Sequence, residues 1–198
     1  MGATIYSLSI TMPSEAQELT RGLRRRDPDL LDRLIEQYDY RLFRYLLSLT
    51  GNRETAEDLF QETWIRVLER GHQYNGKWKF GTWLFTIARN LFVDSLRRKN
   101  PAATALDDAD ENSTLSNLPS SDAPSPFDLQ TRREESDRVA RAVDRLSPTY
   151  REVLVLRFQE DLDLSEISAV VSAPLSTVKA RLYRGMGALR EMLEGGQA

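Results

Sequence analysis

The sequence predicts an all-α fold in which two small helical domains are joined by a flexible acidic linker. Apolar residues recur at intervals of three and four along most of the chain, which is the spacing of one buried helix face. No segment shows the apolar–polar alternation of a half-buried strand. Between the two periodic parts, residues 101–131 contain four prolines and six acidic residues but no lysine or arginine. Such a segment cannot bury enough apolar surface to offset the entropy of ordering. We therefore expect an N-terminal tail over 1–27, helical domains over 28–100 and 132–198, and a linker over 101–131.

Three helices are expected in the first domain, and capping residues mark their ends. Asp27 starts the first helix, because an Asp side chain accepts a hydrogen bond from a free backbone N–H and the following Pro28 is tolerated in the first turn. Gly51 is placed to stop this helix, and Asn52 can cap the next. The expected helices cover 28–50, 53–70 and 80–99.

The second domain shows the same kind of signals. Ser147-Pro148 starts a helix, and Asp163 with Glu166 three residues later resembles a capping box, in which each side chain bonds the other residue's backbone N–H. A short helix from about 164 to 170 and a longer one from about 175 to 193 are expected to follow. An apolar stripe that precedes them consists of Val139, Ala142, Val143 and Leu146.

The composition excludes several kinds of protein. The 198 residues include no cysteine and one histidine, which excludes disulfides, thiolate catalysis and zinc sites built on cysteine. A chain without cysteine fits a reducing cytoplasm. No apolar run approaches the roughly 18 residues of a spanning helix, so no membrane insertion is expected. Because we find no catalytic residues, metal-ligand set or phosphate-binding loop, the sequence predicts that the protein is not an enzyme and needs no cofactor or metal.

The net charge of −3 hides two basic segments. Residues 77–99 carry six cations and one acid, Asp94, and residues 174–190 carry four cations and no acid. The local field, rather than the total charge, governs association with a polyanion. Both segments are therefore candidates for binding nucleic acid.

The first basic segment combines cations with aromatic rings on one helix. The face opposite its apolar stripe offers guanidinium, amide and carboxylate groups, which can read base edges or grip phosphates. Rings at its start can stack on unpaired bases, for about 1–3 kcal/mol per base. From composition alone, a solvated face with core aromatics is an equally good interpretation. The expected buried stripe is Leu84, Ile87, Ala88, Leu91 and Leu96, and the candidate DNA-binding residues are Lys79, Phe80, Trp83, Arg89, Asn90, Asp94, Arg97 and Arg98.

The second basic segment, LSEISAVVSAPLSTVKARLYRGMGAL, has the spacing of a helix-turn-helix. In that motif the second helix enters the major groove of DNA. An ordinary helical hairpin is the alternative, but the absence of acids from the second helix favours DNA. The candidate DNA-binding residues are Ser176, Thr177, Lys179, Arg181, Tyr183 and Arg184.

A third stretch, AEDLFQETWIRVLER, places acids and an amide beside aromatic rings on one helix. Paired carboxylates could serve acid–base catalysis or metal binding, although no histidine, cysteine or glycine-rich loop supports either use. Acids ringed by aromatics also describe a protein-binding face, while a solvated helix face fits the pattern best when it is taken alone. The residues concerned are Asp58, Phe60, Gln61, Glu62 and Trp64.

Taken together and in order, three stretches resemble the motifs of a bacterial sigma factor of the extracytoplasmic-function (ECF) group. They are DLFQETW, FGTWLFTIARNLFVDSLRRK, and LSPTYREVLVLRF with the helix-turn-helix that follows. The resemblance covers about 28–99 and 134–193. It implies a region 2 domain and a region 4 domain that bind core RNA polymerase, recognise the minus-ten and minus-thirty-five elements of promoter DNA, and direct transcription initiation.

The resemblance also implies a role for each group of residues. The five residues of the third stretch would dock on the clamp helices of the polymerase beta-prime subunit, and the beta flap is a further expected partner. The first basic segment would face the minus-ten element, and its loop from Tyr74 to Lys79 would cradle an unstacked base. The residues of the second basic helix would face the minus-thirty-five element. The linker would follow the polymerase's nucleic-acid channel, and an anti-sigma factor is an expected partner.

The sequence departs from the family pattern at four positions. Glycines are frequent in the family where Ser172 and Ser176 stand, and serine fits both sites if the backbone stays at negative φ. Gly185 and Gly187 fall within the last helix, where family members carry better helix formers. Two such glycines cost about 1–2 kcal/mol relative to alanine, so the end of this helix is expected to be loose without DNA.

Three other classes of protein remain as alternatives. A helix-turn-helix regulator that does not bind core polymerase would use only the second domain on DNA. An enzyme would need a pocket with a nucleophile or metal set. A protein adaptor would leave both basic segments solvated, and its association with DNA would not respond to salt. If the two domains pack together, we expect weak DNA binding by the free chain.

Overall fold

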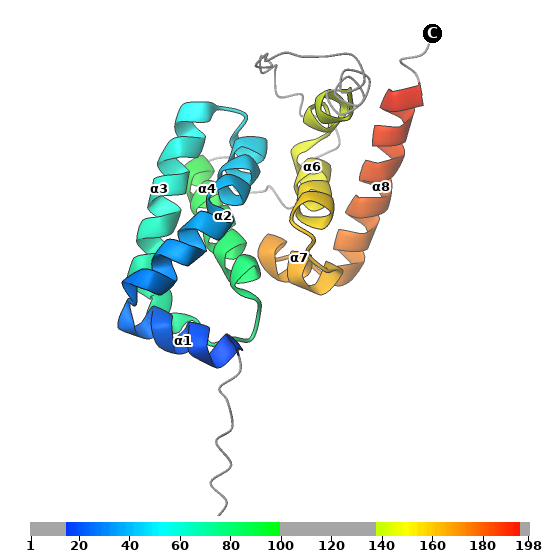
Figure 1. The fold of residues 1–198 in the computed structure, drawn as a ribbon. Helices are drawn as coiled ribbons and strands as arrows, with labels where there is room; N and C mark the ends of the chain where they lie inside the picture. Colours follow the sequence, from blue (N-terminus) through cyan, green and yellow to red (C-terminus); the bar gives the residue numbers. More distant parts are fainter. Residues whose placement is uncertain (1–14, 100–137, 195–198) are drawn as a thin grey trace, which may run out of the picture.

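A computed structural model describes residues 15–99 and 138–194, and Figure 1 shows their arrangement. In these residues the chain is α-helical, with short 3-10 and π-helical segments and no strand. The expected linker over 101–131 lies outside the described residues. Within the described part, no helix is long and apolar enough to cross a membrane.

Helices form two groups that follow the two periodic parts of the sequence. The first group is α1 (Glu15–Arg25), α2 (Pro28–Thr50), α3 (Arg53–Arg70), the 3-10 segment η1 (Gly71–Gln73) and α4 (Phe80–Lys99). The second group is a helical segment over 138–144, α6 (Pro148–Leu154), the π-helical segment η2 (Val155–Gln159), α7 (Leu164–Val171) and α8 (Leu175–Glu194).

The predicted caps of the first domain are confirmed. The Asp27 side chain accepts hydrogen bonds from the backbone N–H groups of Asp29 and Leu30, at 3.1 and 3.4 Å. Gly51 ends α2 in the left-handed region with φ of 61°, and the Asn52 side chain accepts from the Thr55 N–H at 2.8 Å. Local chemistry therefore sets where these helices begin and end.

The prediction of a tail over 1–27 is wrong for residues 15–25, which form α1. Leu23 of this helix is 2% exposed. It packs against Gly71, where an added Cβ would lie 3.0 Å from the Leu23 carbonyl oxygen. The apolar signal is short, and the stability of α1 comes from packing against η1 and α2, which no local pattern displays.

The second domain follows its predicted caps and departs from prediction at one turn. Asp163 and Glu166 form the capping box, with the Glu166 side chain accepting from the Asp163 N–H at 2.9 Å. Ser172 ends α7 with φ of 51°. The expectation of negative φ at this serine is therefore wrong, because the turn needs a left-handed residue to end α7 before α8 starts.

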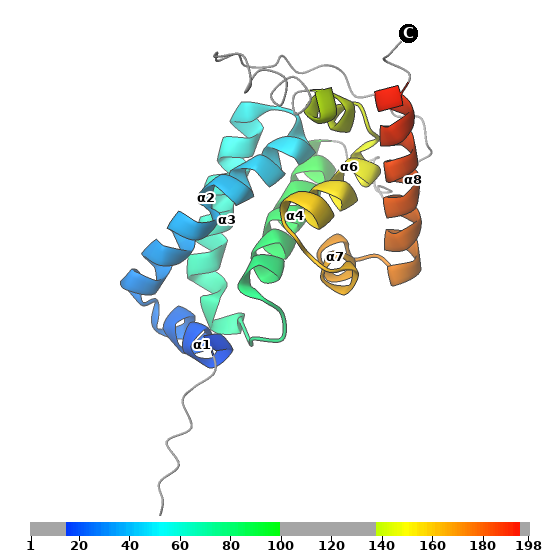
Figure 2. The same cartoon turned by 45° about the vertical axis from the view of Figure 1, so that its right-hand side comes forward.

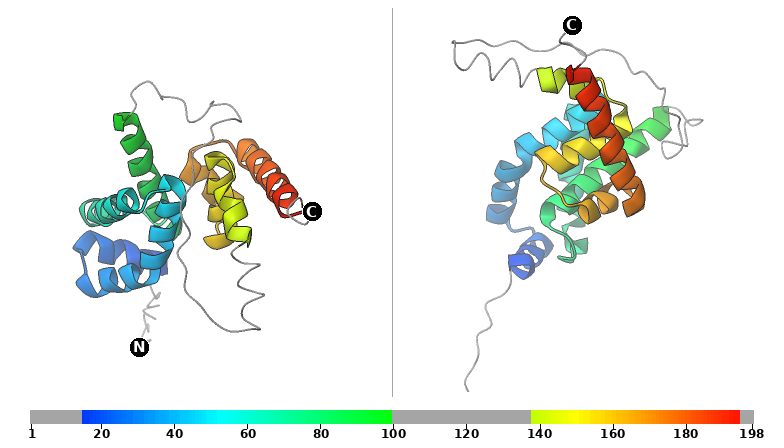
Figure 3. Two further views of the ribbon diagram at one scale, coloured as in Figure 1. Left: turned by 90° about the horizontal axis from the view of Figure 1, so that it is seen from above. Right: turned by 90° about the vertical axis from the view of Figure 1, so that its right-hand side faces the viewer.

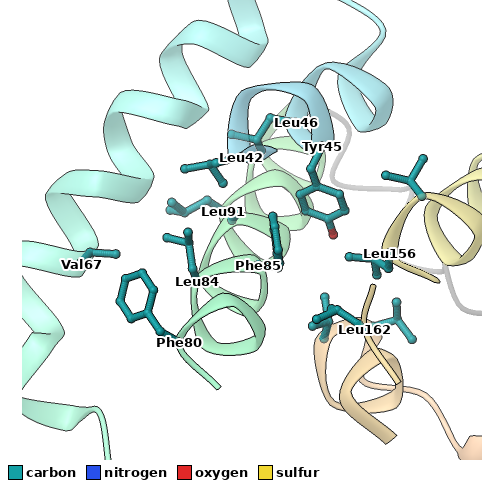
Figure 4. Close-up of a cluster of buried hydrophobic side chains, with 14 of the residues drawn as sticks. Leu42, Tyr45, Leu46, Val67, Phe80, Leu84, Phe85, Leu91, Leu156 and Leu162 are labelled. Atoms are coloured by element: carbon teal, nitrogen blue, oxygen red, sulfur yellow. The ribbon is translucent and has the colours of Figure 1, made fainter. Parts of the chain in front are cut away.

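The two domains share one hydrophobic core. Figure 2 shows α4 flanked by α2 and α3 on one side and by α6 and α7 on the other. In Figure 4, Tyr45 of α2 and Phe85 of α4 face Leu156 and Leu162 of the second domain, and Phe85 and Leu156 are both fully buried. Burial of this apolar surface holds the domains together at about 25 cal/mol per Å² removed from water.

The buried stripe of α4 differs slightly from the predicted one. The structure buries Phe80, Leu84, Phe85, Ala88 and Leu91, whereas Ile87 and Leu96 are only half-buried. The stripe is wider than expected, because α4 packs against three helices and not against one side of a single domain.

Replacing Gly187 with alanine should raise the free energy of unfolding by about 0.5–1 kcal/mol. An added Cβ at Gly187 meets no atom within 4 Å, so only the gain in helix propensity remains. Gly185 is the matched control, because its Cβ would lie 3.1 Å from the Tyr150 Cβ and 3.3 Å from the Leu154 Cδ1. Urea unfolding of both variants checks this, and an equal or larger gain at Gly185 would contradict it.

Candidate nucleic-acid interface

The outward face of α4 carries most of the predicted polar contacts for DNA. Asn90, Asp94, Arg97 and Arg98 are all exposed. The Asp94 carboxylate pairs with Arg97 at 3.7 Å, and both side chains are 61% exposed, so solvent screens this pair. These groups can therefore exchange their contacts for a DNA groove at little cost.

Aromatic residues at the start of α4 divide into a buried ring and a half-buried one. Phe80 is 4% exposed. It meets Tyr38, Tyr74 and Trp83 at ring-centroid distances of 5.3, 6.2 and 5.9 Å. Trp83 is half-buried. The cluster fixes the start of α4, and Trp83 is its partly exposed member.

The loop before α4 is held in shape by its own hydrogen bonds. The Tyr74 hydroxyl donates to the Trp78 carbonyl at 2.8 Å, and the Lys77 N–H donates to the Asn75 side chain at 3.0 Å. Gly76 has φ of 71°, a conformation that favours glycine. This preformed loop presents cations and a partly exposed indole at the surface.

Arg89 does not lie on the free face of α4. Its guanidinium donates to the Glu152 carboxylate of α6 at 3.1 Å, and the two side chains are 13% and 9% exposed. The same carboxylate oxygen accepts from the Tyr45 hydroxyl at 3.0 Å. Burial, and then the Glu152 charge, raise the pKa of Tyr45 well above its ordinary value. The second domain therefore covers one predicted DNA-binding arginine.

Two more acids of the second domain meet the first domain. Glu166 accepts from the Thr82 hydroxyl at 2.9 Å and lies 3.6 Å from the Lys79 ammonium. Glu160 accepts from Arg41 at 2.8 Å. The side chains of Glu160 and Glu166 are 1% and 4% exposed. The boundary between the domains is thus lined by acids from one side and by cations and hydroxyls from the other.

Sequence reasoning missed these boundary residues. Glu152 and Glu166 stand beside apolar residues of the second domain, and a charge at a buried helix position needs a partner. That local signal could have marked these two acids as paired. Glu160 stands between Gln159 and Asp161, and no such local signal marks it. No local signal could have named Arg41, Tyr45 or Arg89, which are distant in the sequence.

Lowering the pH should stabilise the folded protein through Glu160. Burial raises the pKa of its carboxyl above the ordinary value, although Arg41 opposes this shift. The resulting stability is fully present below the unfolded-state pKa and is lost as the pH rises through the higher folded-state pKa. The stability of E160Q relative to the unchanged chain should therefore increase with pH in thermal unfolding. A difference that stays constant, or falls, with pH would contradict this.

The helix-turn-helix places its predicted contacts on α8. Ser176, Lys179, Tyr183 and Arg184 are exposed, whereas Thr177 and Arg181 are half-buried. In Figure 3, α8 lies at the outer side of the second domain, away from α3 and α4. Val178 is fully buried and anchors this helix to the domain, so its polar residues point toward solvent.

The third stretch, AEDLFQETWIRVLER, lies on α3. Its polar groups reach solvent, whereas its aromatic rings pack in the domain. Asp58 and Gln61 are exposed, and the half-buried Glu62 pairs with Arg66 at 2.8 Å. Trp64 is 8% exposed, and Phe60 meets Phe43 with ring centroids 6.1 Å apart. Within the described residues, no group of three or more His, Cys, Asp or Glu side chains could hold a metal ion.

The fold and the two basic faces define a helical DNA-binding protein with a helix-turn-helix domain. Comparison with known proteins gives its family. The sigma-70 region 2 model matches residues 34–101, and the sigma-70 region 4 model matches 136–189. The chain belongs to the ECF RNA polymerase sigma factors, which direct transcription initiation and are not enzymes.

Individual relatives agree with this family. SigW, an ECF RNA polymerase sigma factor of Bacillus subtilis, is 31% identical over 177 residues, which are 87% of this chain and 94% of the relative. SigE of Mycolicibacterium smegmatis is 34% identical over 162 residues, 82% of this chain and 61% of the relative. CnrH, solved in complex with the cytosolic domain of CnrY, shares the fold with a TM-score of 0.61, 18% identity and coverage of 90% and 96% of the two chains.

Proposed function

We propose that the exposed polar groups of α3 bind core RNA polymerase through the beta-prime clamp helices. The observation that carries this proposal is the position of Asp58 and Gln61, which are exposed on a helix that lies far from the second domain (Figure 1). Glu62 adds a second carboxylate on the same helix. Phe60 and Trp64 contribute indirectly, because their rings pack in the domain and hold in place the helix that carries the polar groups.

The loop before α4 and the outward face of that helix bind the minus-ten element. Asn90 and Asp94 face the bases, while Arg97 and Arg98 hold phosphates. Lys79 and Trp83 flank the loop that takes an unpaired base. Phe80 supports this loop from the core. The exposure of the polar groups and the preformed shape of the loop support this assignment.

The second domain binds the minus-thirty-five element with α8. Lys179 and Arg184 are suited to phosphates or guanine, and Tyr183, at 76% exposure, offers a ring and a hydroxyl to the groove. Ser176 and Thr177 stand at the start of the helix, and Arg181 stands one turn further on. These are the positions from which a recognition helix reaches base edges.

Protein partners of the second domain have a separate surface. An open groove of about 500 Å³ lies between α6 and α8 and is lined mainly by apolar side chains, including Leu154, Phe158 and Met186. Phe158 is 63% exposed, which suits the beta flap of the polymerase as its occupant. An anti-sigma factor is a further partner, as in the solved complex of the sigma factor RpoE with the anti-sigma factor NepR from Bartonella quintana. The site of action is the cytoplasm.

In the free protein the packed domains reduce DNA binding. The second domain pairs with Arg89 and Lys79, which the minus-ten element also needs. Core polymerase has to separate the domains to place their DNA-binding faces on two promoter elements. Tight, sequence-specific promoter binding by the isolated chain would contradict this.

The combined change Gln61→Ala and Glu62→Ala should abolish core binding and promoter-directed transcription. Both positions are solvent-accessible and alanine favours helix, so the fold should persist. Purified core polymerase is used in a pull-down and a transcription assay with each chain. A matched control removes one amide and one carboxylate elsewhere, at Gln73 and Glu191, which are both exposed.

Two outcomes separate this function from its main alternative. If the unchanged chain binds core and starts transcription at a defined site, while only the α3 variant fails, the assignment stands. If the unchanged chain does not bind core but binds duplex DNA, the first domain does something else and the protein is a helix-turn-helix regulator.

A further inference from the structure

An open pocket of about 410 Å³ lies between α1 and the loop before α4. Its first wall includes Thr20, Arg21 and Arg24 of α1, and its second wall is Asn75 and Gly76. Helix α1 ends at residue 25, before the segment from 34 that matches sigma-70 region 2. One wall of the pocket therefore lies outside the segment that matches region 2. The other wall belongs to the loop that we propose holds an unpaired base.

The two walls are fixed relative to each other. An added Cβ at Gly76 would lie 3.4 Å from the Ala16 Cβ and 3.5 Å from the Thr20 hydroxyl oxygen. At the other end of the contact, buried Leu23 lies against Gly71. Helix α1, which carries the arginines, therefore stands at a constant place beside the loop (Figure 1).

The wall formed by α1 is strongly basic. Arg21, Arg24 and Arg25 are exposed, and within the described ranges no ion pair joins any of them to a carboxylate. Glu18 on the same helix also forms no such pair there. Exposed Lys77, which follows Gly76 of the second wall in the sequence, adds another cation to the loop. This basic surface attracts negatively charged partners, and a polyanion offers several negative charges in a row.

We propose that this arginine face binds the phosphodiester backbone of the single strand whose unpaired base enters the loop. Guanidinium groups match phosphate oxygens with two parallel hydrogen bonds. None of the described residues that line the pocket is aromatic, so this lining suits a backbone and not a base. The inference rests on the proposed assignment of the loop to an unpaired promoter base. It extends the minus-ten surface from α4 onto α1.

The test uses the holoenzyme made from core polymerase and the full chain. The probe is a short forked DNA with the minus-ten segment of a promoter mapped from this holoenzyme's own transcripts, with unpaired bases and no minus-thirty-five duplex. The combined change Arg21→Gln and Arg24→Gln should lower the slope of log affinity against log salt by about 1.4, because each single-strand phosphate contact contributes about 0.7. Affinity at 0.1 M salt should fall on the order of tenfold.

A matched control removes two exposed arginines of the second domain, Arg141→Gln and Arg145→Gln, which this probe does not engage. Neutral methylphosphonates in the unpaired strand should remove the difference between the α1 variant and the unchanged chain. Equal slopes for the α1 variant and the control would overturn the proposal, as would an equal loss on a fully paired probe. If the unchanged holoenzyme does not prefer the forked probe to the duplex, the loop assignment fails first and this inference fails with it.

Discussion

Replacing Glu152 with alanine is expected to separate the two domains of the free protein while leaving each domain folded. The Glu152 carboxylate joins Arg89 at 3.1 Å and Tyr45 at 3.0 Å across the boundary. Removing one partner of a buried ion pair typically costs about 3–5 kcal/mol, because the other charge stays buried without compensation. Opening of the boundary hydrates Arg89 and avoids that cost, so the open arrangement should gain population against the opposing burial of the shared apolar core. The exposed arginine should then increase the affinity of the free chain for minus-ten DNA.

Energy transfer between two dyes measures this opening directly. The chain has no cysteine, so cysteines introduced at the exposed positions Glu36 and Glu191 would be the sole labelling sites. Asp161→Ala is the control, because the Asp161 side chain is 98% exposed and lies 4.0 Å from Arg157. Transfer should fall for Glu152→Ala and stay unchanged for the control. If transfer is the same in all three proteins, Glu152 does not hold the domains together.

The second large effect is expected at Phe80, where the sequence indicates a DNA contact and the structure buries the ring. Phe80→Ala should lower the free energy of unfolding by about 3–5 kcal/mol, as for other large aromatic side chains removed from a core. The cavity would open among Tyr38, Tyr74 and Trp83, and the loop before α4 would lose its support. Urea unfolding gives the change in stability, and binding of forked DNA by the holoenzyme gives the change in function.

Phe80→Leu distinguishes support of the loop from direct stacking on a base. Leucine keeps much of the volume, so stability should fall by less than about 1.5 kcal/mol, and DNA binding should persist. If Phe80 stacks on a base, the leucine variant should instead lose about 1–3 kcal/mol of binding free energy. Trp83→Leu provides the comparison, because this half-buried ring is the one that we propose meets DNA, and its loss should weaken binding more than it weakens the fold.

Much of the fold could be predicted from the sequence because its signals are local. Asp27, Gly51 and Asn52 mark helix ends through hydrogen bonds and backbone conformations that involve only a few neighbouring residues. The helix-turn-helix could be predicted in the same way, from the helical spacing of its apolar residues and a short break between two such segments. The expectation of a negative φ at Ser172 was wrong, because the geometry of the turn, and not the residue type, decides the sign of φ.

The candidate site could be predicted only in part. Asn90, Asp94 and Arg97 face solvent as the helical period indicates, since the period places them opposite the buried stripe. Arg89 lies on the edge of that face, and the same period cannot tell whether another domain covers it. The site roles of all these residues stay predictions until the DNA and polymerase experiments are done.

Most of the helices, their caps, the basic segments and the resemblance to the family could be predicted from the sequence, because each depends on residues close together in the chain. Helix α1 and the contacts between the domains became visible in the folded structure alone. The pairing of Arg41 with Glu160 and of Arg89 with Glu152 spans 119 and 63 residues, and the docking of α1 against the loop brings residues 16 and 20 beside Gly76. Such contacts depend on the packing of whole helices. The sequence shows that a residue is charged, but it does not show which distant residue will neutralise it.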